Sequence, residues 1–175
     1  MMKIYEWNEQ EQQGASKAYI PLGPSGLGGW LVLVQIGMIA MLFSLVLKLL
    51  NYNLPSFNAE YWGMLASKEG ELYHPLWAPL IVFEAIANLL LLVLCVFTLV
   101  LFYQKKALLP RVIILLYCSS LFISVIDYIF LLNIPLARET SGGRSTRTLV
   151  RSVITCVIWL AYFRKSERVS NTFVR

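Results

Sequence analysis

Four long runs of apolar residues dominate the pattern along the chain, and polar segments separate them. The runs cover residues 30–50, 80–103, 112–132 and 149–163. A helix needs about 20 mostly apolar residues to cross the hydrocarbon core of a bilayer. The first three runs reach that length, and the fourth reaches it when the helix begins near residue 145. The pattern therefore predicts four membrane-spanning helices, over about 30–50, 80–103, 112–132 and 145–163.

The runs show no alternation of apolar and polar residues. Backbone groups in lipid must pair internally, so only helices and closed barrels cross a membrane. Barrel strands alternate over about 10 residues, whereas residues 89–94 are all apolar. We expect an all-α integral membrane protein, a four-helix transmembrane bundle over 27–163. A polar arm, 1–26, precedes it and a basic tail, 164–175, follows it, and both are expected to be mobile.

Composition supports this fold class and excludes others. The chain is 58% hydrophobic and 14% charged, against about 45–50% and about 25% in soluble domains. A soluble enzyme and a disordered linker are therefore excluded. The net charge of +5 does not indicate a nucleic-acid partner, because the basic residues are not clustered among stacking groups on one folded surface.

The positions of lysine and arginine predict the orientation, since cytoplasmic loops carry an excess of both. With four spans, both termini share a side with the turn at 104–111. That side carries nine basic residues: Lys3, Lys17, Lys105, Lys106, Arg111, Arg164, Lys165, Arg168 and Arg175. The loops on the other side carry four: Lys68, Arg138, Arg144 and Arg147. We therefore expect both termini in the cytoplasm.

Each of the four apolar runs contains one ionisable residue near its outer end. These are Lys48, Glu84, Asp127 and Arg151, and Asn88 shares a helical face with Glu84 at i,i+4. An unpaired charge at the bilayer centre costs about 2.5–3.5 kcal/mol on insertion scales. We therefore expect an intramembrane polar cluster of these five residues, in which Arg151 pairs with Asp127 or Glu84.

Two interpretations of this cluster stay open. The ion pairs can simply hold the helices in register and rotation. Alternatively, they line a polar pocket, open to the outside, that binds a small polar ligand or a proton. In the second case the protein would be a small transporter or ion-coupled carrier. It would then act as a homodimer, because four helices are few for a complete pathway.

No residue pattern indicates catalysis, a metal site or a cofactor. His74 is the single histidine, and the three cysteines lie inside predicted spans without a Cys-x-x-Cys spacing. The glycine-rich stretch 24–29 lacks the Gly-Lys-Ser/Thr ending of a phosphate-binding loop. We therefore expect a non-enzymatic accessory or interaction protein.

Two segments are candidate contact surfaces. In the tail, Arg164, Lys165, Arg168 and Phe173 are expected to contact anionic lipid headgroups or a cytoplasmic protein, since each basic residue near a membrane contributes about 1 kcal/mol. The outer loop 51–75 is long enough for a short surface helix near 57–66 and is a second candidate surface for a protein partner.

Two segments resemble a known family. Residues 26–31, Gly-Leu-Gly-Gly-Trp-Leu, are similar to its N-terminal signature. Trp159, Tyr162 and residues 166–174, Ser-Glu-Arg-Val-Ser-Asn-Thr-Phe-Val, are similar to its C-terminal one. The family is the YdgK-like bacterial inner-membrane proteins, a domain of unknown function (2569). The resemblance implies a four-helix protein of the bacterial inner membrane with both termini in the cytoplasm. It implies no activity, and residues 1–15 and 133–148 lie outside the pattern.

Overall fold

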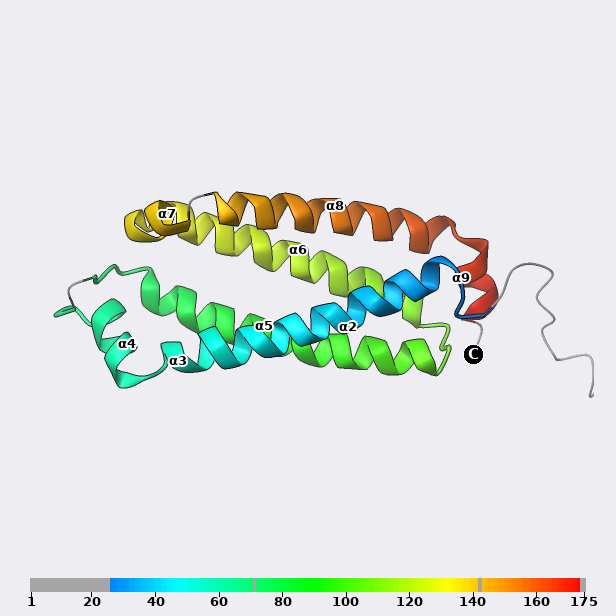
Figure 1. Ribbon diagram of the computed structural model, residues 1–175, viewed down its shortest axis with the longest axis horizontal. Coiled ribbons are helices and arrows are strands. Elements are labelled where there is room, and N and C mark those ends of the chain that lie inside the picture. Colours follow the sequence, from blue (N-terminus) through cyan, green and yellow to red (C-terminus); the bar gives the residue numbers. More distant parts are fainter. Residues whose placement is uncertain (1–25, 71, 142, 174–175) are drawn as a thin grey trace, which may run out of the picture.

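The regular elements of the described chain are all helices (Figure 1). The computed structural model describes residues 26–70, 72–141 and 143–173. Its long helices are α2 (Trp30–Lys48), α5 (Trp77–Tyr103), α6 (Leu109–Asn133) and α8 (Arg144–Lys165). Four helical segments in the described chain are long and apolar enough to cross a membrane. The prediction of an all-α, four-helix membrane protein is therefore confirmed.

The first span is longer than the pattern predicts. A π-helical turn, η1 (Leu49–Asn53), and a short helix, α3 (Leu54–Ser56), continue α2. Together they form a helical segment of 27 residues over Trp30–Ser56. The apolar run ends at residue 50 because Asn51 and Asn53 follow it, but both lie in the π-turn, and the side chain of Asn53 is buried. The helix therefore continues through these polar residues by way of one π-helical turn, in which the hydrogen bonds run from i to i+5.

Two further helices lie in the loops at the same end of the bundle. Helix α4 (Ala59–Leu65) follows the first span and confirms the short helix expected near 57–66. Helix α7 (Pro135–Ser141) follows α6 and was not expected from the sequence. Ile134 and Ala137 hold it against Leu80 at the start of α5, in a small apolar cluster. We call this the α7 end of the bundle.

Helix α6 lies at the centre of the packing. It packs along α8 on one side and α5 on the other, and α5 packs along α2. Helices α2 and α8 make little direct contact. In Figure 1, α2 crosses the bundle diagonally, from the end of α8 at the right toward α3 and α4 at the left.

The largest core lies at the opposite end from α7. Phe102, Leu31, Leu109, Ile113 and Val34 are fully buried there. A last helix, α9 (Glu167–Thr172), packs against this core, and we call it the α9 end (Figure 1). One end of the bundle is therefore more tightly packed than the other.

The described part of the tail is folded, so the expectation of a mobile tail is wrong for residues 164–173. Ser166 caps α9 by accepting a hydrogen bond from the backbone N–H of Val169 at 3.4 Å. Val169 and Phe173 are buried, and the ring of Phe173 lies 5.8 Å from that of Phe102. Both side chains pack into the large core and so hold this part of the tail against the bundle. The arm, 1–25, lies outside the described residues.

The N-terminal glycine segment lies directly against α9. The backbone N–H of Gly26 donates to Thr172 Oγ1 at 3.0 Å. A Cβ atom on Gly29 would lie 2.7 Å from Nη1 of Arg168, and Gly29 has φ 63° and ψ −135°. That region of backbone space is essentially restricted to glycine. The two segments that carry the family resemblance therefore form one structural unit.

Candidate functional site

Three of the four intramembrane charges meet at the α7 half of the bundle. The ammonium of Lys48, the last residue of α2, lies 4.0 Å from Glu84 Oε1 and 3.9 Å from Asp127 Oδ2. Glu84 comes from α5 and Asp127 from α6, so the lysine joins three helices. The side chains of Lys48, Glu84 and Asp127 are 37%, 27% and 17% exposed. One cation thus lies between two partly buried carboxylates.

The expected pairing of Arg151 with Asp127 or Glu84 is wrong. Lys48 occupies the position beside both acids. In the described chain no carboxylate lies within 4.0 Å of the Arg151 guanidinium. Lys48 reaches both acids because α2 packs along α5, which carries Glu84. Arg151 on α8 lines a neighbouring cavity instead, beside Ser120 on the same face of α6 and about two turns from Asp127.

Asn88 lies one turn further into α5 than Glu84, and it contacts an amide that the sequence analysis missed. Its Nδ2 lies 2.6 Å from Oδ1 of Asn53, and both residues are buried. The bond links α5 to the π-turn η1. The one available signal was a polar residue three positions after the first apolar run, a place more typical of a loop.

A cavity of about 230 Å³ surrounds the charged group, and we call it the carboxylate cavity. It contains all three charged residues together with hydroxyl-bearing residues of α6 and α8. The lining residues include Lys48, Glu84, Asp127, Ser124, Tyr128 and Thr148. Oδ1 of Asp127 is buried there and has no hydrogen-bond partner within the described chain.

A second cavity, of about 410 Å³, lies where α2 and α8 diverge. We call it the arginine cavity. Its polar lining comes from three helices and consists of Arg151, Ser152, Thr155, Thr148, Ser120 and Ser44. Gly37 and Ala40 of α2 line it as well, and their small side chains leave the space open.

The two cavities adjoin. Thr148 lines both, and the hydroxyls of Ser124 and Ser152, one from each cavity, lie 3.4 Å apart. The structure therefore brings all four intramembrane charges to neighbouring cavities, although it divides them three and one. Such a surface offers fixed charges of both signs and several hydroxyls, which suits binding of a small polar group.

Aromatic side chains close the arginine cavity toward the α9 end. The rings of Tyr117 and Trp159 stack at 6.4 Å and line its floor. Tyr117 belongs to the large core, and Trp159 packs against that core. Below this floor the helices are joined by apolar side chains such as Met38 and Ile113.

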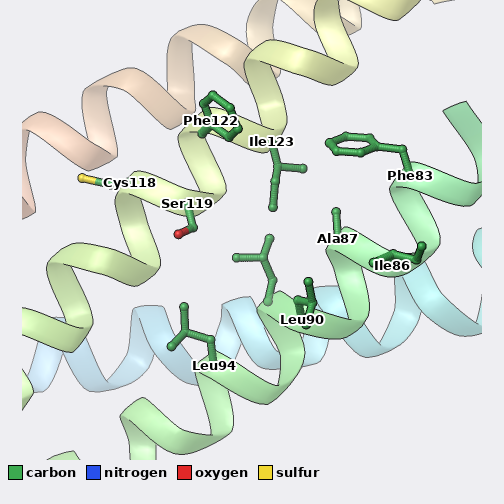
Figure 2. Close-up of a pocket in the computed structure, with 10 residues that line it drawn as sticks. Phe83, Ile86, Ala87, Leu90, Leu94, Cys118, Ser119, Phe122 and Ile123 are labelled. Atoms are coloured by element: carbon green, nitrogen blue, oxygen red, sulfur yellow. The ribbon is translucent and has the colours of Figure 1, made fainter. Parts of the chain in front are cut away.

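A third cavity is apolar. It measures about 550 Å³ and lies between α5 and α6 (Figure 2). Figure 2 shows Phe83, Leu90 and Phe122 among its lining, and the hydroxyl of Ser119 is the one oxygen drawn. Leu90 and Phe122 are also exposed on the outer surface of the bundle. This groove suits lipid acyl chains and not a polar solute.

Only some of the residues expected to form contact surfaces in the tail and in the loop 51–75 are exposed. Arg164 and Lys165 are exposed, but Arg168 lies against Gly28 and Gly29. Phe173 is buried in the core, which removes it from any contact surface of the tail. In the loop 51–75, the rings of Phe57 and Trp62 stack with their centroids 5.8 Å apart.

The remaining titratable residues of the described chain form no metal site. The described residues contain no group of three or more histidine, cysteine, aspartate or glutamate side chains that could hold a metal ion. The three cysteines are free thiols. His74 accepts a hydrogen bond from the backbone N–H of Leu76 at 3.3 Å, as a loop histidine commonly does.

Comparison with known proteins identifies the family. The model of the family described as "Protein of unknown function (DUF2569)" matches residues 24–174. No curated protein and no solved structure matches the chain. The matched segment includes all four spans, the glycine segment and helix α9. The resemblance seen in residues 26–31 and 166–174 is thereby confirmed, and the chain belongs to the DUF2569 family of multi-pass membrane proteins.

Proposed function

We propose that this protein is a non-enzymatic accessory protein of the bacterial inner membrane that holds a small polar ligand in the two adjoining cavities. The proposal rests on one observation: the two ends of the bundle differ in polarity and packing. Charged cavities occupy the α7 half, and a stacked Tyr117–Trp159 floor separates them from a dense core at the α9 end.

The charge distribution supports an orientation for this site. Nine lysine and arginine residues fall on the side of the termini, and four fall in the loops of the other side. The positive-inside rule then favours an α9 end in the cytoplasm and cavities in the outer leaflet. The ligand would enter from outside.

The packing favours binding over transport. A transporter working through Glu84, Asn88, Asp127 and Arg151 needs a route that also reaches the cytoplasmic side. Most of the buried side chains beyond the floor are apolar, and Leu31, Val34 and Ile113 among them are fully buried. A ligand bound on the α7 side of these residues would therefore be accessible from one side of the membrane only.

Thiol labelling tests whether the site is hydrated from one side. In a chain whose native cysteines are replaced by alanine, Ser124→Cys places a thiol in the carboxylate cavity. Val125→Cys is the matched control, because Val125 is exposed on the apolar surface one residue further along α6. A charged, membrane-impermeant methanethiosulfonate is applied to right-side-out and to inside-out vesicles.

We expect Ser124→Cys to react from the outside alone and Val125→Cys to stay unreacted, because a charged reagent does not enter lipid. Equal reaction of Ser124→Cys from both sides would support the transporter instead. An unreactive Ser124→Cys would refute a hydrated binding site.

A further inference from the structure

Arg151 differs from the other three intramembrane charges in having no oppositely charged partner in the described chain. It lies in the arginine cavity, on the third turn of α8, and its side chain is exposed. We infer that the arginine cavity binds the phosphate group of an anionic membrane lipid, with Arg151 as the main contact. This inference rests on the proposed function and narrows it, since it names the ligand class of one of the two cavities.

The distribution of charge selects an anion for this cavity. A cation without a counter-charge is unfavourable inside a membrane, and a bound phosphate would supply that counter-charge. The carboxylate cavity would repel the same group, because Glu84 and Asp127 outnumber Lys48. Anion binding is therefore expected in the arginine cavity and not in the carboxylate cavity.

The polar lining fits a phosphate. Arginine presents a planar fork of N–H donors that binds phosphate oxygens in pairs. Ser44 of α2, Ser120 of α6 and Thr155 of α8 line the same cavity as Arg151 and bring hydroxyl groups to it. The Ser44 hydroxyl already donates to Ala40 O at 2.8 Å, so Ser120 and Thr155 are the better hydroxyl donors to a ligand.

The sides of the cavity favour a lipid as the source of the phosphate. Helices α2 and α8 make little contact, so the cavity faces the membrane laterally. Ala40 lines it and shares a helical face with Ile36 and Phe43, which are exposed. On α8, Arg151 shares a face with Ile154 and Ile158, which are also exposed. Acyl chains can therefore lie along both helices while the headgroup enters the cavity.

The depth of Arg151 agrees with this arrangement. It lies seven residues from the start of α8 at Arg144, which is about 10 Å at a rise of 1.5 Å per residue. A long arginine side chain reaches from such a depth toward the interface. The guanidinium then lies near the level of the lipid phosphates.

Lipid retention tests the inference. The parent, Arg151→Gln and Arg147→Gln are reconstituted in phosphatidylcholine nanodiscs with increasing phosphatidylglycerol. Bound phosphatidylglycerol is counted by native mass spectrometry, and Tm is followed in parallel. Arg147 is the matched control, because it is exposed on the same helix one turn nearer the end and does not line the cavity. A second variant, Ala40→Leu, fills the cavity without removing a charge.

We expect the parent to retain phosphatidylglycerol and Arg151→Gln to bind it about tenfold more weakly, since one charge-assisted contact is worth about that factor. Ala40→Leu should lose retention as well, and Arg147→Gln should not. Equal retention by the parent, Arg151→Gln and Ala40→Leu would overturn the inference.

A separate experiment distinguishes a lipid phosphate from a soluble phosphate compound as the ligand. Inorganic phosphate and glycerol 3-phosphate are added to the parent in pure phosphatidylcholine nanodiscs. If either raises Tm as much as phosphatidylglycerol does, the ligand is soluble and the lipid assignment is overturned. If Ser124→Cys reacts from outside but no phosphate compound binds, this inference fails and the proposed function stands. If Ser124→Cys is unreactive, the proposed function fails.

Discussion

Removal of the Lys48 ammonium is the sharpest test of the three-charge group. Lys48→Gln deletes contacts of 4.0 and 3.9 Å to Glu84 and Asp127 and leaves two carboxylates without a cation between them. Opposite charges 4 Å apart attract by about 4 kcal/mol at an effective dielectric constant of 20. Desolvation offsets most of this attraction, and measured polar contacts in membrane proteins average about 0.6 kcal/mol with a maximum near 1.7.

With two such contacts, we expect Lys48→Gln to lower the free energy of unfolding by about 2 kcal/mol. Asp127→Asn should lower it by about 1 kcal/mol, because the Lys48–Glu84 pair survives. The double variant should be no less stable than Lys48→Gln alone, since Asp127→Asn also removes one of the two opposing negative charges. The two losses are therefore expected not to add.

Equilibrium unfolding in mixed dodecyl maltoside and dodecyl sulfate micelles, followed by tryptophan fluorescence, measures these differences. Lys106→Gln is the matched control, since it removes an exposed lysine outside the spans. A second cycle pairs Asp127→Asn with Arg151→Gln, which should be close to additive because these two side chains make no direct contact. Full additivity of the Lys48 and Asp127 losses, or strong coupling of Asp127 to Arg151, would refute the assignment of partners.

Three further predictions concern the packing, and the same unfolding assay checks them. Gly29→Ala should lose about 1–3 kcal/mol because its backbone conformation is essentially restricted to glycine, whereas Gly63→Ala, with open space around it, should not. Phe173→Ala should lose about 3 kcal/mol by opening a cavity beside Phe102, and no loss would mean that α9 is not held to the bundle. Asn88→Ala should lose about 1–3 kcal/mol by leaving the buried Asn53 amide unpaired; replacing both asparagines by leucine should restore much of that loss, and a further loss would contradict the pairing.

The number and approximate bounds of the spans could be predicted because the bilayer imposes them. Apolar runs of about 20 residues have few alternatives to a helix in lipid, since every backbone amide must bond within its own segment. The helix at Ala59–Leu65 and the family membership also follow from local patterns. In each case the signal lies within one short stretch of chain.

The partners of the charged residues could not be predicted in the same way. Depth along a helix follows from residue number, and it placed Lys48, Glu84, Asp127 and Arg151 at one level. Which cation meets which carboxylate depends on how each helix is rotated and on which helices are neighbours. Because α2 packs along α5 and diverges from α8, Lys48 reaches the acids and Arg151 faces a separate cavity.

The sequence alone therefore predicts a four-helix membrane protein and the intramembrane charges Lys48, Glu84, Asp127 and Arg151. Contacts between distant segments were decided by the tertiary structure alone. Asn53 lies in a π-turn and contacts Asn88 of α5. Phe173 is buried because its ring packs 5.8 Å from that of Phe102 in the core at the α9 end. Each of these two contacts joins side chains that are far apart in the sequence. The pattern of apolar and polar residues within one segment does not predict such a partner.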